Sequence, residues 1–221
     1  MKPRLLFVTT LLSTLWAVGL FSTNLSASNI AVKITRSIDK FEVKHGDKMV
    51  TVMRNQNTRA VITPTFALTS RKCPPFCIQP LHVAPGVNNM GEVELIHFMM
   101  TDLKAGTGLL IDARTPDWHA RGTIPGSINI PYIEVSPSLG ADEISIEDAL
   151  VRLGAKRVNN TWDFSDAKKL VLWCNGPWCG QSPTAIRGLL ELNYPAEKIF
   201  YYRGGMQSWQ SFSLTVVPPT E

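Results

Sequence analysis

The stretch LVLWCNGPWCGQSPTAIRGLLELNY, residues 170–194, decides the fold class. Residues 170–173 form a short apolar run of the kind found in interior parallel strands. Ser182 and Pro183 then predict a helix start, with the serine as N-cap and the proline in the first helical position. The helix that follows carries its apolar side chains roughly on one face: Ala185, Ile186, Leu189, Leu190 and Leu192. A strand, a tight loop and a helix in this order are typical of a parallel α/β sheet.

Two cysteines lie in the loop of this unit, Cys174 at the end of the predicted strand and Cys179 shortly before the helix. The unpaired N–H groups and the dipole of a helix N-terminus favour a thiolate over a thiol. Gly176, Pro177 and Gly180 shape a loop rather than a packed core. A chemically reactive cysteine is therefore favoured over a buried one that only packs.

Three segments in this order resemble a rhodanese domain. LLIDARTPDWHARGTIPGSINIPY (109–132) resembles the strand–Asp-x-Arg segment and the G-H-I-P-G-A-x-N-I-P signature of that family. The loop at 174–182 corresponds to its active-site loop, and KIFYYRGGMQSW (198–209) to its closing G-G-x-x-x-W. The resemblance covers roughly residues 87–216. It implies a parallel five-stranded sheet flanked by helices, and a cysteine that takes sulfur from a donor as a persulfide and passes it to a nucleophile.

The resemblance places the sulfur carrier at Cys174. The residues expected around the sulfur and its substrate are Asn175, Gly176, Trp178, Cys179, Gly180, Gln181 and Ser182. Cys179 is interpreted as a resolving or modulating thiol. Asp112 and Arg114 are expected to hold the loops at the strand ends. A cysteine phosphatase is excluded, because it needs an arginine six residues after the nucleophile, where this chain has Gly180.

The loop departs from the family pattern in two ways. Cys179 stands where the family has an arginine, and the loop is about two residues longer than usual. It also contains no Lys or Arg, which argues against the thiosulfate dianion as the preferred donor. Arg121 and Arg203 are the expected outside sources of positive charge. Backbone N–H groups of the loop can still form a cradle for an anion without Lys or Arg, because they need no charged side chain.

The N-terminus predicts export. Residues 1–4 are a short positive start, residues 5–21 an apolar stretch broken by hydroxyl side chains, and Ala27 a plausible cleavage point. A retained membrane anchor is the alternative, although 17 residues are short for a span. We therefore expect a periplasmic protein without a stable membrane span after processing, or a secreted or membrane-anchored one if the signal stays uncleaved.

Charge and histidine content exclude other classes. The net charge is +4, and loss of Lys2 and Arg4 with the signal peptide leaves about +2, too little to indicate binding to nucleic acid or a membrane surface. None of the four histidines makes a ligand spacing with a cysteine pair. We therefore expect no metal and no cofactor. The expected partners are a small sulfur donor and a thiol or protein acceptor.

The other two cysteines, Cys73 and Cys77, flank two prolines in the segment CPPFC. In an oxidising compartment such a pair predicts a structural disulfide, and a redox pair that exchanges with the first is the alternative. The segment lies in a small β-rich region, residues 28–86, between the signal peptide (1–27) and the rhodanese-like domain (87–216). A turn signal at Gly46 predicts a β-hairpin over residues 41–53.

Within the main domain we expect these elements in chain order: a helix at 91–103, strands at 109–113 and 127–130, a helix at 146–153 opened by a capping box of Ser145 and Asp148 and closed by Gly154, an irregular loop at 156–169, and a last strand at 198–202. Three functions stay open at this point: an exported sulfurtransferase, a thiol–disulfide redox protein that uses Cys174 and Cys179, and a non-catalytic binding module.

Overall fold

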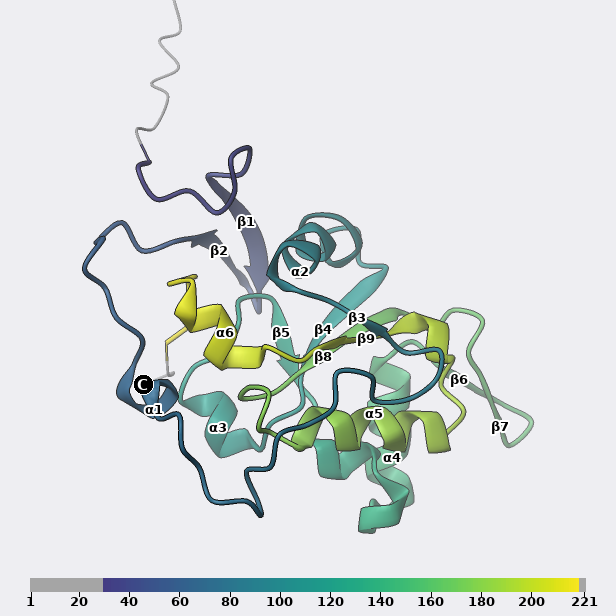
Figure 1. Ribbon diagram of the computed structural model, residues 1–221. Coiled ribbons are helices and arrows are strands. Elements are labelled where there is room, and N and C mark those ends of the chain that lie inside the picture. Colours follow the sequence, from purple (N-terminus) through teal and green to yellow (C-terminus); the bar gives the residue numbers. More distant parts are fainter. Residues whose placement is uncertain (1–29, 219–221) are drawn as a thin grey trace, which may run out of the picture.

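The computed structural model describes residues 30–218, and its centre is a parallel sheet of five strands in the order β3-β9-β8-β4-β5 (Figure 1). The strands are β3 Asn88–Asn89, β4 Gly108–Asp112, β5 Ser127–Asn129, β8 Lys169–Trp173 and β9 Ile199–Tyr202. Every pairing in this sheet is parallel. The predicted five-stranded parallel sheet is confirmed. The predicted signal peptide, residues 1–27, lies outside the described residues.

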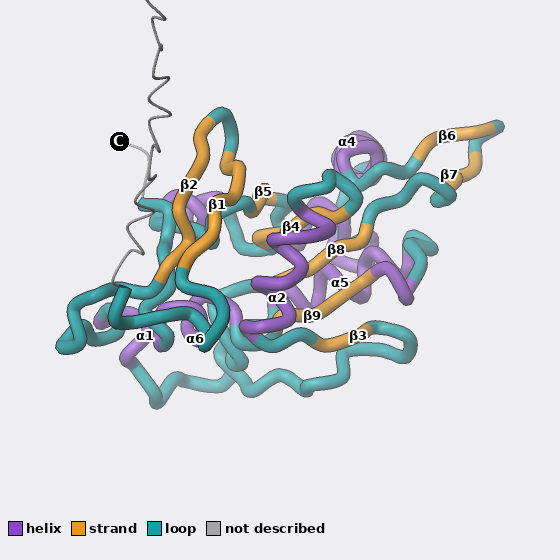
Figure 2. The backbone as a smooth tube through the Cα atoms, turned by 90° about the horizontal axis from the view of Figure 1, so that it is seen from above, coloured by secondary structure: helices purple, strands orange, loops and turns teal. Residues whose placement is uncertain are grey.

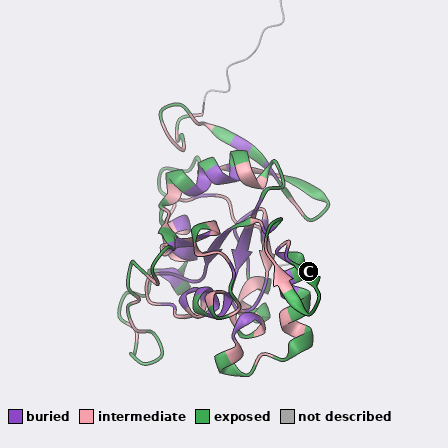
Figure 3. Ribbon diagram, turned by 90° about the vertical axis from the view of Figure 1, so that its right-hand side faces the viewer, coloured by how far each residue is buried: buried purple, intermediate pink, exposed green. Residues whose placement is uncertain are grey.

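Helices cover both faces of the sheet. On one face pack α4 (Glu143–Arg152) and α5 (Gln181–Glu191), and on the other α2 (Glu92–Phe98) and α6 (Gly205–Ser211). The predicted helix at 91–103 is present, but its second half, Met99–Leu103, is a π-helix. Figure 3 shows that the strands of the sheet are buried and that the helices turn buried faces toward them. The short helix α3 spans Pro116–Ala120.

The N-terminal region packs on the sheet and shares its core. The predicted hairpin forms as β1 (Lys40–His45) and β2 (Lys48–Met53), and α1 spans Pro64–Ala67. Val52 and Phe66 belong to the same buried cluster as Trp209 of α6. From α1 a long loop runs along the outside of the molecule to β3 (Figure 2). This loop contains the Cys73–Cys77 segment. It has no helix or strand of its own, and it brings the N-terminal region to the carboxyl ends of the sheet strands.

Two helix starts differ from the predictions. α4 begins at Glu143, because the Asp142 carboxylate caps it by accepting a hydrogen bond from the Ser145 N–H at 3.0 Å; Ser145 itself lies inside the helix. α5 begins at Gln181 with Gly180 as its N-cap, so Ser182 is not the cap. The Ser182 hydroxyl instead donates a hydrogen bond to the Cys174 sulfur.

The predicted irregular loop at 156–169 is also wrong in part, because it contains a second hairpin, β6 (Lys156–Val158) and β7 (Thr161–Asp163). Its two turn residues, Asn159 and Asn160, have φ of 47° and 60°. Asparagine tolerates this left-handed conformation, which two-residue hairpin turns require. Among residues 30–218 no helix is long and apolar enough to cross a membrane.

Candidate active site

Cys174 directly follows β8, at the carboxyl end of a strand that lies between β9 and β4. In open parallel sheets, binding sites form at these strand ends. The loop that begins at Cys174 is held from α6: the Met206 N–H donates to the Cys174 carbonyl and the Gln207 N–H to the Asn175 carbonyl, both at 2.9 Å. The Cys174 side chain is buried, with 2% of its surface exposed. The sulfur therefore lies in a fixed and nearly dry position.

Hydrogen bonds on the Cys174 sulfur favour its thiolate. The Ser182 hydroxyl donates to it across 3.0 Å. Burial by itself raises the pKa of Cys174, but hydrogen bonds from the Cys179 thiol, from the Ser182 side chain and N–H, and from the Gly176 N–H outweigh it, so that the pKa lies below its ordinary value. The donors of this cradle are one hydroxyl, one thiol and backbone N–H groups, and among residues 30–218 no positively charged side chain joins them. The Cys179 carbonyl, 3.2 Å from the sulfur, is an acceptor for the thiol form of Cys174.

The two cysteines of the loop differ in character. Burial and the neighbouring Cys174 raise the pKa of Cys179 well above its usual value. Cys179 is therefore the protonated partner, and its thiol also reaches the Gln181 Oε1 at 3.7 Å. Neither cysteine of this pair is disulfide-bonded. Nucleophilicity follows the thiolate, so the arrangement supports the prediction that Cys174, not Cys179, is the nucleophile.

A buried ion pair frames the loop from β4. Arg114 binds Asp112 through both carboxylate oxygens, at 2.8 Å and 2.6 Å, and its Nη1 donates to the Asn175 Oδ1 at 3.2 Å. Burial raises the pKa of Asp112, but hydrogen bonds from Arg114 and His119 outweigh it and keep that pKa below its usual value. Asp112 and Arg114 thus hold the ends of the strands as expected, and Arg114 also fixes Asn175, the residue after Cys174.

Of the two predicted outside cations, the structure brings one to the loop. Arg203 donates twice to the Gln79 carbonyl, at 2.9 Å and 2.8 Å, and lines a cleft together with Trp178. Arg121 instead pairs with Asp117 at 3.6 Å and lines a different cleft, beside the N-terminal hairpin. The structure therefore does not bring Arg121 to the loop, because its guanidinium lies against Asp117 and the Trp118 ring of α3.

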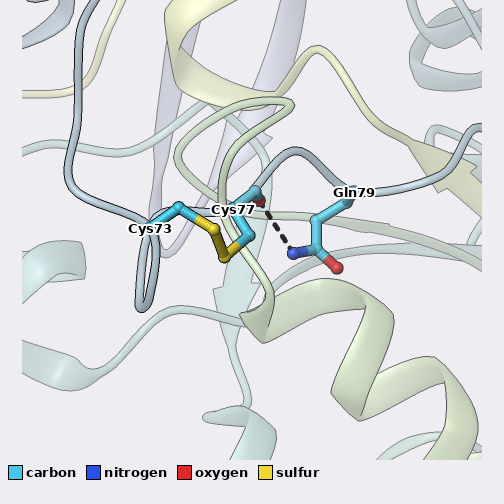
Figure 4. Close-up of a disulfide and its surroundings, with 3 residues drawn as sticks. All are labelled: Cys73, Cys77 and Gln79. Carbon is cyan, nitrogen blue, oxygen red and sulfur yellow. Dashed lines mark hydrogen bonds between the residues drawn. A yellow bond between two sulfur atoms is a disulfide. The ribbon is translucent and has the colours of Figure 1, made fainter.

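The segment that contains the Cys73–Cys77 disulfide covers the loop, which the sequence did not indicate (Figure 4). The Gln79 N–H donates to the Pro177 carbonyl at 2.7 Å. The Phe76 ring meets the Trp178 ring edge-on, with centroids 5.6 Å apart, and the Arg71 guanidinium lies 3.8 Å from the centroid of that tryptophan. The CPPFC motif is the only local signal for this contact, and a local motif does not say where in the fold it packs.

Tyr201 of β9 is a second residue that sequence reasoning missed. Its hydroxyl is buried and has no hydrogen-bond partner in the described part of the chain. Burial, followed by the nearby charge of Cys174, raises its pKa far above the ordinary tyrosine value, so it stays protonated. It is an unused donor beside the cysteine pair. Only the strand pairing, which places Tyr201 opposite Leu172 of β8, brings it there.

Replacement of Ser182 tests the cradle. In Ser182→Ala the sulfur loses one donor, so the pH profile of Cys174 alkylation moves to higher pH. A hydrogen bond to a charged group is worth about 1.5 kcal/mol, so alkylation at neutral pH slows by about tenfold. Iodoacetamide labelling across pH, followed by peptide mass analysis, measures this. Ser136→Ala removes another buried serine, whose hydroxyl donates to the Tyr132 carbonyl rather than to the sulfur, and leaves the profile unchanged. An unchanged profile in Ser182→Ala contradicts the role of its hydroxyl.

Comparisons with known proteins give the family of this chain. A family model described as a rhodanese-like domain matches residues 98–212. A comparison with curated protein sequences finds no match. Among solved structures, a human single-domain sulfurtransferase is 22% identical and covers 57% of this chain and 96% of its own, with a TM-score of 0.37. An As/Sb reductase from Leishmania major is 17% identical and covers 60% of this chain and 92% of its own, with a TM-score of 0.42.

Proposed function

Because the chain belongs to the rhodanese-like family, we propose that it is a sulfurtransferase that carries sulfur as a persulfide on Cys174. The observation that carries the proposal is the cradle at the end of β8, where the Ser182 hydroxyl lies 3.0 Å from the Cys174 sulfur and lowers its pKa together with the other donors. A thiolate is the form that attacks sulfur. The proposed partners are a small sulfur donor and a thiol or protein acceptor.

The proposed reaction has two displacements at sulfur. The Cys174 thiolate attacks the outer sulfur of a donor R–S–SH, a new S–S bond forms to Cys174, and the donor's own S–S bond breaks to release RS⁻. An acceptor thiolate then attacks the outer sulfur on Cys174, takes it as its own persulfide, and restores the thiolate. The donors that surround the Cys174 sulfur stabilise negative charge wherever it develops there, since they are fixed before the reaction begins.

The choice of donor follows from the missing loop charge. Between Cys174 and Ser182 no side chain is cationic, and one lost charge-assisted contact is worth about 1.5–3 kcal/mol, or roughly ten- to a hundredfold in transition-state binding. We expect poor turnover of thiosulfate with cyanide and better use of an organic persulfide. Mild reduction raises activity, because a Cys174–Cys179 disulfide blocks loading. Steady-state assays with thiosulfate and glutathione persulfide, with and without prior reduction, test both points; efficient thiosulfate turnover by unreduced protein contradicts them.

One observation favours a second candidate, a thiol–disulfide redox protein. Cys179 shares one short loop with Cys174, and its backbone carbonyl lies 3.2 Å from the Cys174 sulfur. Attack of Cys179 on a disulfide between Cys174 and a substrate would release the substrate thiol and leave a Cys174–Cys179 disulfide. Under this candidate, Cys179→Ser loses all turnover. Under the proposed sulfurtransferase, it keeps sulfur loading on Cys174.

We propose further that the protein is exported to the periplasm after cleavage of residues 1–27. The Cys73–Cys77 disulfide supports this, since disulfides persist mainly in oxidising compartments. N-terminal sequencing of the protein from its native host is expected to begin near Ser28 or Asn29. A chain that begins at Met1 and partitions with membranes shows instead that the apolar stretch is a retained anchor.

A further inference from the structure

A cleft with an unusual lining lies beside the cysteine loop. Its volume is about 790 Å³, within the size range of sites for small organic molecules. The loop contributes Pro177 and Trp178 to its wall, and the preceding segment contributes Arg71 and the Cys73–Cys77 disulfide. Arg203 closes another side. The lining contains two guanidinium groups and no Asp or Glu.

Both guanidinium groups carry uncompensated charge. Among residues 30–218, neither Arg71 nor Arg203 lies in an ion pair with a carboxylate. Arg203 donates two N–H groups to the Gln79 carbonyl, a neutral acceptor that does not balance its charge. The Nε of Arg71 is buried without any acceptor. Two partly buried cations without a counter-ion favour an anion between them.

The structure holds these cations in place. Arg71 lies over the Trp178 ring, 3.8 Å from its centroid, and the indole N–H of Trp178 donates to the Gln207 Oε1 at 2.7 Å. The Gln207 amide in turn donates to the Phe66 carbonyl at 2.9 Å. Cation, ring and amide thus form a chain of contacts from the N-terminal region to α6. A guanidinium fixed in this way loses little freedom when it binds a carboxylate.

From this cleft we infer a substrate subsite: Arg71 and Arg203 bind the carboxylates of an organic thiol or persulfide, whose apolar part lies on Trp178. The inference rests on the proposed sulfur transfer at Cys174 and names the substrate class for it. A guanidinium pairs with a carboxylate through two parallel hydrogen bonds. One Nη2 N–H of Arg71 donates to the Thr65 carbonyl, and the cation–π contact, which uses the face of the guanidinium, leaves its Nη1 available. The cleft is far larger than an inorganic sulfur anion needs, so its size favours a donor or acceptor with an organic body.

The subsite explains how a loop without cations can serve an anionic substrate. Arg71 lies outside the residues that match the family model, 98–212, so the N-terminal region supplies the charge that the loop lacks. Its other cation, Arg203, directly follows β9. The positive charge is placed at the tip of the loop, beside Trp178, rather than next to the sulfur. These two cations therefore bind the carboxylate end of a substrate, while the hydrogen-bond donors around Cys174 contact its reacting sulfur.

The test measures binding of a probe that cannot transfer sulfur, S-methylglutathione, to the wild-type protein by calorimetry. Its diethyl ester, with both carboxylates blocked, is expected to bind about ten- to a hundredfold more weakly. Arg71→Ala is expected to weaken binding of the free acid by a similar factor. Arg59→Ala, which removes an exposed arginine outside the cleft, leaves it unchanged.

Three results overturn the inference: no binding of S-methylglutathione at millimolar concentration, equal binding of acid and ester, or equal binding by wild type and a folded Arg71→Ala. The comparison of acid with ester uses only the wild-type chain, so it decides even if the variant fails to fold. This experiment measures binding and involves no sulfur transfer. Its result therefore does not depend on whether Cys174 forms a persulfide, and either proposal can be contradicted while the other stands.

Discussion

Cys174→Ser is expected to abolish sulfur transfer, with a fall in turnover of at least about a thousandfold. A serine hydroxyl stays protonated at neutral pH and is a far weaker nucleophile than a thiolate. The rate that remains is that of the uncatalysed reaction, increased only by binding of the substrates to the protein. Steady-state turnover of an organic persulfide with a thiol acceptor measures the effect, and unfolding by urea establishes that the variant is folded.

Cys179→Ser is the matched control for this result, since it changes the other thiol of the same loop. It removes one donor to Cys174, so turnover falls by about tenfold at most. It also removes the possibility of a disulfide within the loop, so the variant no longer needs prior reduction. If Cys174→Ser keeps full activity and Cys179→Ser loses it, the roles of the two cysteines are reversed.

Gly205→Ala is expected to damage both stability and the site. Gly205 begins α6 with φ of +54°, and a Cβ atom there would lie 2.1 Å from the Cys174 carbonyl oxygen. That oxygen belongs to the loop backbone and accepts the Met206 N–H, so it cannot simply move aside. The left-handed conformation costs an alanine about 1–2 kcal/mol, and the clash raises the total loss of unfolding free energy to about 4 kcal/mol.

Gly140→Ala separates these two causes. Gly140 has φ of +85°, but a Cβ atom there meets no atom within 4 Å. Its substitution therefore costs only the conformational part, about 1–2 kcal/mol. Urea unfolding of both variants, with persulfide turnover measured beside it, gives the comparison. Equal losses in the two variants would show that the contact between Gly205 and the Cys174 carbonyl has no energetic weight.

Much of the sheet could be predicted because its signals are local. The apolar run at 170–173 and the segment that ends at Asp112 are both strands in the structure, paired in parallel with Asp112 opposite Trp173. The helix starts were harder, since several polar side chains compete for the same N–H groups. Asp142 caps α4 from one turn earlier than Ser145 would, because a carboxylate at that point reaches the Ser145 N–H directly.

The candidate site was predictable only where it is continuous in sequence. Cys174 and Cys179 lie in one loop and Ser182 in the first turn of the helix that follows it, and the structure brings their side chains together. Arg71 and Tyr201 approach the same loop from separate parts of the chain, through packing and strand pairing that no local pattern encodes. Arg121 shows the opposite error, since a charge expected near the loop lies on another surface.

The central claim, that Cys174 carries sulfur, is tested most directly by intact-mass and peptide analysis of the reduced protein after exposure to an organic persulfide. We expect a gain of about 32 Da, the mass of one sulfur atom, located on the peptide that contains Cys174 and absent in Cys174→Ser. A mass that stays unchanged after exposure, or added sulfur that maps to Cys179 alone, would contradict it.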